Sequence, residues 1–118
     1  MAEGYIQNNV PESKVSLSSG ITFINGSNYD NRTFISKTGI IYSLNVFVTI
    51  NDTTIDATNW IPLLSHNDFQ NASGFRFTVY NATKNVVGVC RLENDKLYLN
   101  PTNISVGDII YGSITYIK

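Results

Sequence analysis

Apolar and polar residues alternate most clearly between residues 39 and 50. A period of two over the whole segment predicts a β-strand with one face on the core and the other partly in water. The predicted inner face consists of Ile40, Tyr42, Leu44, Val46, Val48 and Ile50. The opposite face consists of Ile41, Ser43, Asn45, Phe47 and Thr49. Residues 75–80 alternate in the same way, which predicts that Phe75, Phe77 and Val79 point inward.

The rest of the chain is also rich in strand signals. Runs of β-branched and aromatic residues at 21–24, 33–37, 86–92, 96–100 and 109–117 are separated by turn residues, notably at 25–28, 38–39, 81–85 and 94–95. No segment has the helical spacing of apolar residues over three turns, so no long helix is expected. The pattern predicts an all-β fold: an antiparallel β-sandwich or jelly-roll-like barrel of about eight short strands.

The pattern also suggests how the chain is divided. Residues 1–20 are polar and weakly patterned, and we interpret them as a lead-in or linker with a short strand over 14–18. Residues 21–118 form one predicted β-sandwich domain. Its two irregular stretches, 51–59 and 65–74, are expected to be loops, and binding residues tend to lie on loops of a rigid β-scaffold.

Composition narrows the function classes. Charged residues make up 14% of the chain, and Asn, Ser and Thr replace them, which fits an extracellular β-protein or a virion component. The eight cations are scattered and the net charge is -1, so nucleic-acid binding is not expected. Residues 1–10 lack the pattern of a signal peptide, and no apolar run is long enough to predict insertion into a membrane. With one cysteine, no intrachain disulfide can form, which favours folding in a reducing cytosol.

The chain offers few groups for catalysis or metal binding. His66 is the only histidine and Cys90 the only cysteine, so a zinc site or a base-activated nucleophile is not expected. Cys90 alternates with apolar neighbours and is predicted to lie in the core. Asn51, Asp52 and Asp56 could supply oxygen ligands to calcium, but solvated turn residues are the favoured interpretation. We therefore expect a protein that is not an enzyme and needs no cofactor.

Aromatic and polar residues in or beside loops are the candidates for binding. A neutral saccharide is held by an aromatic face against its C–H groups and by polar side chains on its hydroxyls. For Trp60, a structural role as a plug between strands is the alternative to stacking on a sugar. The candidate ligand-binding residues are Trp60, His66, Asn67, Asp68, Tyr29, Asp30 and Arg32.

From residue 21 onward the chain resembles the small β-sandwich head domains of phage tail-fibre and baseplate receptor-binding proteins. The resemblance rests on an opening strand with a polar turn (21–26), a hairpin into a long strand (37–42) and a Trp-Ile-Pro-Leu-Leu segment (60–64). A late hairpin (91–99) and a terminal strand (109–117) complete it. The collagen-like or coiled-coil shaft that usually precedes such heads has no counterpart here. The family has no invariant sugar-binding motif, so no site residue is carried over.

The resemblance implies a homotrimeric phage or prophage protein, made in the bacterial cytoplasm and assembled with other virion proteins in a tail or baseplate. Its head would recognise a host cell-wall saccharide, and the composition fits a low-GC Gram-positive host. A trimer is expected to cover Ile41, Phe47 and Ile117. Two alternatives stay open: a structural virion protein (decoration, neck or baseplate adaptor) without a sugar site, and a carbohydrate-binding module of a secreted enzyme.

Overall fold

The computed structural model describes residues 16–18 and 20–117, which form ten strands and one short 3-10 helix, η1 (Asn67–Ala72). The predicted all-β fold is confirmed. No helix in the described part of the chain is long and apolar enough to cross a membrane. In chain order the strands are β1 (Ser16–Ser18), β2 (Thr22–Phe23), β3 (Gly26–Asn28), β4 (Phe34–Thr38), β5 (Ile41–Ile50), β6 (Ile61–Ser65), β7 (Arg76–Asn81), β8 (Val86–Glu93), β9 (Lys96–Leu99) and β10 (Ile109–Ile117).

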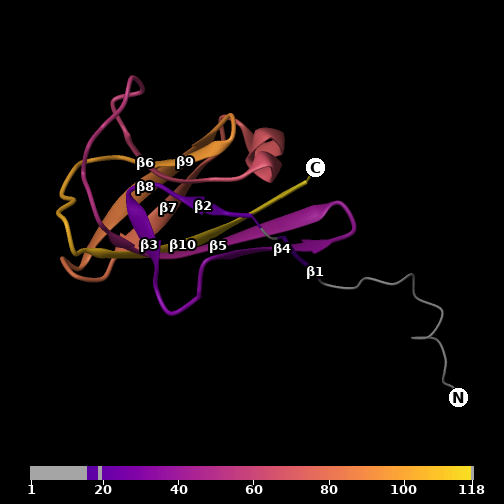
Figure 1. The fold of residues 1–118 in the computed structure, drawn as a ribbon, viewed down its shortest axis with the longest axis horizontal. Helices are drawn as coiled ribbons and strands as arrows, with labels where there is room; N and C mark the ends of the chain where they lie inside the picture. Colours follow the sequence, from indigo (N-terminus) through magenta and orange to yellow (C-terminus); the bar gives the residue numbers. More distant parts are fainter. Residues whose placement is uncertain (1–15, 19, 118) are drawn as a thin grey trace, which may run out of the picture.

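The strands form one antiparallel sheet in the order β1-β4-β5-β10-β7-β8-β9-β6-β2. The chain segment that contains β2 and β3 nearly closes this sheet into a barrel. β2 pairs with β6 at one end of the order, and β3, a few residues later, pairs with β5. Figure 1 shows the resulting curvature, with β6 and β9 on the opposite side of the core from β5 and β10. Of the two predicted forms, the barrel-like one is observed.

The core follows the predicted alternation along β5. Tyr42, Leu44, Val46, Val48 and Ile50 are buried, whereas the odd-numbered positions are partly or fully exposed. In β10 the same alternation puts Ile110, Ile114 and Tyr116 on one face, and Ile110 and Tyr116 are buried. β9 and β6 supply leucines from the other side of the barrel, and Phe69 of η1 is fully buried at one end.

Two residues predicted to face the core are exposed. The Phe75 side chain is 48% exposed because Gly74, with φ at +93°, and the bond from the Phe75 N–H to the Ala72 carbonyl form a turn just before β7. Ile40 is 62% exposed because it lies in the β4–β5 turn that Gly39 allows with φ at +61°. Side chains alternate between the two faces only where the backbone is extended. Phe75 and Ile40 each lie one residue before the strand begins, so the alternation does not apply to them.

The predicted turn at residues 25–28 is a strand over most of its length. Gly26–Asn28 is β3, and a Cβ at Gly26 would lie 3.4 Å from Val48 Cβ, so a glycine suits this close strand pairing. The chain reverses later, at Asp30 and Asn31, which adopt φ of +52° and +57°. Asp and Asn tolerate this left-handed conformation better than most residues, and this explains why the turn lies there.

The start of the described chain belongs to the sheet. Ser16–Ser18 pairs with β4, in register from Ser16 with Lys37 to Ser18 with Ile35. Of the short strand predicted over 14–18, residues 14 and 15 lie outside the described residues, as does the remainder of 1–13. The predicted loop at 65–74 contains the end of β6 and the helix η1.

Candidate functional site

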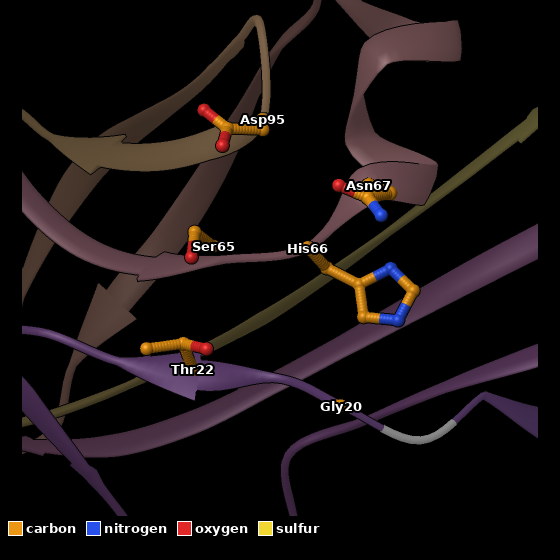
Figure 2. Close-up of a pocket in the computed structure, with 6 residues that line it drawn as sticks. All are labelled: Gly20, Thr22, Ser65, His66, Asn67 and Asp95. Atoms are coloured by element: carbon orange, nitrogen blue, oxygen red, sulfur yellow. The ribbon is translucent and has the colours of Figure 1, made fainter.

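A polar pocket of about 330 Å³ lies where the end of β6 meets η1. We call this the polar pocket; its lining residues are Gly20, Thr22, Ser65, His66, Asn67 and Asp95. The pairing of Thr22 with Ser65, and of Ser65 with Lys96, brings three distant segments to one place. Figure 2 shows the Thr22, Ser65 and Asp95 side chains on adjacent segments, with His66 and Asn67 beside them. Two of the seven predicted ligand-binding residues, His66 and Asn67, are part of this pocket.

His66 fixes the start of η1. Its backbone is extended, and its Nδ1 atom accepts a hydrogen bond of 3.0 Å from the Asp68 N–H. The His66 N–H donates to the Asp95 carbonyl at 2.8 Å, which ties the start of η1 to the β8–β9 turn. Asp68 is therefore a neighbour of the pocket and not part of its lining; its carboxylate lies 3.7 Å from His66 Nδ1. These contacts fix the pocket wall that carries Asn67.

The pocket is suited to hydrogen bonding. Its side chains offer two hydroxyl groups, an amide, an imidazole and the Asp95 carboxylate, and no apolar side chain lines it. Asp95 has the Lys96 ammonium 3.4 Å away, which balances its charge. Hydroxyls and amides can both donate and accept, so the lining can satisfy a ligand that carries many hydroxyl groups.

Tyr29 and Arg32 belong to a different surface. There an aromatic row of Tyr29, Phe47, Tyr111 and Tyr80 crosses the outer face of β5, β10 and β7. The Phe47 ring stacks on Tyr29 at 5.0 Å and on Tyr111 at 5.1 Å between centroids, and Tyr80 meets Tyr111 edge-on at 5.5 Å. The Arg32 guanidinium carbon lies 5.2 Å from the Phe47 centroid. Because β3 and β10 flank β5 on opposite sides, the two faces of Phe47 are occupied and do not form a flat platform for a sugar.

The predicted residue Asp30 lies at the tip of the turn beside this row. Its carboxylate is 3.6 Å from Arg32, and the two side chains are 74% and 54% exposed. An ion pair that exposed contributes little to stability. The structure therefore groups Tyr29, Asp30 and Arg32 together, but separately from the residues of the polar pocket.

Trp60 lies in a third place, against two arginines of the outer sheet face. The Arg91 and Arg76 guanidinium carbons lie 4.5 Å and 5.4 Å from its ring centroid. We call these three residues the arginine–tryptophan cluster. Trp60 is partly exposed, so it is neither a core plug nor a bare platform. Sequence reasoning missed both arginines, since only the pairing of Arg76 with Arg91 across β7 and β8 brings them together.

The groups considered for metal binding and for thiol chemistry have local structural roles. The Asp52 and Asp56 carboxylates each accept hydrogen bonds from the N–H and hydroxyl of the threonine two residues later. Burial would raise the pKa of Asp56, but hydrogen bonds from Thr58 and Tyr98 and the Lys96 charge outweigh it and lower that pKa. Within residues 20–117 no three His, Cys, Asp or Glu side chains gather as a metal site. Cys90 is fully buried, as predicted, and burial raises the pKa of its thiol.

In comparisons with protein-family models, with curated proteins and with solved structures, none matches this chain. The resemblance to phage receptor-binding heads therefore stays a prediction from the sequence, and the functional argument depends on the geometry of the sites.

Proposed function

We propose that this chain is a non-catalytic binding module, the head of a phage or prophage receptor-binding protein that holds a host cell-surface saccharide. The polar pocket is the observation that carries the proposal. Its volume falls at the lower end of small-ligand sites, and all the side chains that line it can form hydrogen bonds. A saccharide hydroxyl donates and accepts at once, which is the chemistry that such a lining complements.

The orientation of His66 supports a binding role over a catalytic one. Ser65 and His66 are neighbours in the pocket, and a serine beside a histidine raises the question of a nucleophile and its base. The Nδ1 atom of His66 is used by the Asp68 N–H. In Figure 2 the imidazole is turned away from the Ser65 hydroxyl. Consecutive residues of an extended segment point in opposite directions, so this pair is poorly placed for proton transfer.

A homotrimer is part of the proposal. Ile41 of β5 and Ile117 of β10 are opposite each other in register and are 46% and 61% exposed. Such an exposed apolar pair suits a contact with another copy. Phe47 contributes less than the sequence suggested, because Tyr29 and Tyr111 already cover its ring. Light scattering at micromolar concentration is expected to give the mass of three chains, and a monomer would contradict this part of the proposal.

The experiment for the saccharide site is staining of intact Gram-positive cells with fluorescently labelled protein, with wall saccharide as competitor. Asn67→Ala removes one pocket amide and is expected to weaken binding by about tenfold, equivalent to about 1.4 kcal/mol. Asn71→Ala is a matched control, because Asn71 lies in the same helix, is also exposed and does not line the pocket. Equal loss of staining in both variants would show that η1, and not the pocket amide, is responsible.

A further inference from the structure

The polar pocket and the arginine–tryptophan cluster lie on the same outer face of the barrel. Along β9, Leu97 and Leu99 point into the core, so Lys96 and Tyr98 lie on the other face of the strand, where Tyr98 is covered and only 7% exposed. Lys96 pairs with Ser65 of the pocket, whereas Tyr98 pairs with Arg91 of the cluster. Lys96 and Tyr98 are about 7 Å apart along β9, and Arg91 and Arg76 lie one and two strands further on, at about 4.8 Å per strand. A ligand of several sugar units can therefore reach from the polar pocket to the cluster.

Arg76 and Arg91 form a like-charged pair, which is normally unfavourable at directly opposite positions on neighbouring strands. The Trp60 ring offsets part of this repulsion through its π face, which lies within cation–π distance of both guanidinium carbons. Trp60 follows the long loop between β5 and β6, and Asp56 of that loop hydrogen-bonds Tyr98. The loop thus positions the indole beside the two arginines.

The two guanidinium groups have unused donors. Among the described residues, no carboxylate forms an ion pair with Arg76, and neither arginine side chain donates a hydrogen bond of good geometry. The Nε atom of Arg91 is buried without a hydrogen bond, although Glu93 Oε1 lies 3.3 Å away as an ion pair. Each guanidinium has five N–H donors, arranged as a fork that matches a carboxylate or a phosphate.

The nearby charges are equal in number, with Arg76, Arg91 and Lys96 against Glu93, Asp95 and Asp56, but they do not all form ion pairs. Glu93 balances Arg91, Asp95 lies beside Lys96, and Asp56 is bound to Tyr98 and Thr58. Once each acid is assigned to its neighbour, Arg76 remains without one in the described part of the chain. Its side chain is exposed and lies beside a partly exposed indole, so both are accessible to a ligand from solvent.

We propose that the arginine–tryptophan cluster binds an anionic group, a carboxylate or a phosphodiester, on the same saccharide whose hydroxyls occupy the polar pocket. This inference rests on the proposed function and narrows it to an acidic glycan. Arg76 and Arg91 would bind the anion, while Trp60 would hold the two guanidinium groups beside each other.

The test is a titration of the whole protein followed by NMR at the arginine Nε–Hε signals. The probes are sodium glucuronate, dimethyl phosphate and neutral glucose, with sodium chloride holding the ionic strength constant. A saturable shift is expected with one or both anions and none with glucose. The tighter of glucuronate and dimethyl phosphate identifies the anionic group as a carboxylate or a phosphodiester.

Three variants sharpen the result. Arg76→Gln, at an exposed position, is expected to weaken anion binding by about tenfold, and Arg76→Lys by less, since the charge stays but the planar fork is lost. Lys37→Gln is the control: it removes one positive charge and one cation–π contact, with Tyr42, on another strand. Shifts that rise linearly without saturation, or that are equal in wild type and Arg76→Gln, would overturn the inference.

Cell staining separates this inference from the proposed function. If the protein binds an anion saturably but stains no cells, the proposed function is wrong and the anion site is still supported. Staining that is competed by wall saccharide but is equal for wild type and Arg76→Gln, with no anion titrating, would overturn the anion site alone.

Discussion

Gly112 of β10 lies close against β7, and we predict that Gly112→Ala strongly destabilises the protein. A Cβ at residue 112 would lie 2.7 Å from Val79 Cγ1, 3.1 Å from the Thr78 carbonyl oxygen and 3.2 Å from Val79 Cα. The last two contacts are with backbone, so a change of side-chain rotamer cannot relieve them. The two strands must separate by several tenths of an ångström at the centre of the sheet.

The expected cost is about 1–3 kcal/mol, as for other overpacked cores. One kcal/mol lowers Tm by about 4–8 °C in a domain of this size, so Tm should fall by about 5–20 °C. Thermal unfolding followed by circular dichroism measures this. In a Val79→Ala background the 2.7 Å contact disappears and the backbone contacts remain, so Gly112→Ala should cost less there without becoming neutral.

Gly88→Ala is the matched control. Gly88 is also a strand glycine that faces Val79, but its added Cβ would come no closer than 3.3 Å, to Val79 Cγ2, and the next contact is 3.8 Å, to Leu99 Cδ1. We expect it to cost less than about 1 kcal/mol. A Gly112→Ala variant that unfolds at the wild-type temperature, or above Gly88→Ala, would refute the close approach of β10 and β7.

Two further predictions concern buried groups. Burial would raise the pKa of Asp108, but hydrogen bonds from Asn81, Lys84 and the Ser105 N–H outweigh it and lower that pKa. The ionised Asp108 carboxylate therefore stabilises the folded protein. This stabilisation is complete above the unfolded-state pKa of Asp108, near 4, and is lost as the pH falls through the folded-state pKa. Asp108→Asn should lower the free energy of unfolding by about 1–3 kcal/mol at pH 7. It should also make Tm fall less steeply as the pH is lowered below the unfolded-state pKa. An unchanged fall of Tm at acid pH would contradict this role of Asp108. Cys90 should react with a thiol reagent only in denaturant; rapid labelling of the native protein would show that it is accessible.

The sequence predicted well what depends on local alternation. The inner face of β5 from Tyr42 to Ile50 and the buried positions of β10 follow from period-two patterning alone. It failed where pairing decides the conformation. β3 has the sequence of an Asn-Gly turn but forms a strand because it pairs with β5, whose partner residues lie 20 to 24 positions away. Phe75 matches the alternation but lies in a turn set by Gly74.

The candidate sites show the same limit. His66 and Asn67 could be found because they are polar residues in a predicted loop. Thr22, Ser65 and Asp95 could not, since they meet only through the pairing of β2 with β6 and of β6 with β9. Arg76 and Arg91 belong to no motif in the sequence, and only the structure shows that both lie beside Trp60. No local signal records a contact between strands that are distant in sequence.

The central claim is that the polar pocket binds a saccharide on the surface of a bacterial host. Staining of a broad panel of intact Gram-positive cells by the labelled protein, with and without wall saccharide, tests it most directly. We predict staining of a narrow set of strains that the saccharide abolishes, that Asn67→Ala weakens and that Asn71→Ala preserves. Absence of staining across the panel by a verified trimer would contradict the claim and favour a structural virion protein without a sugar site.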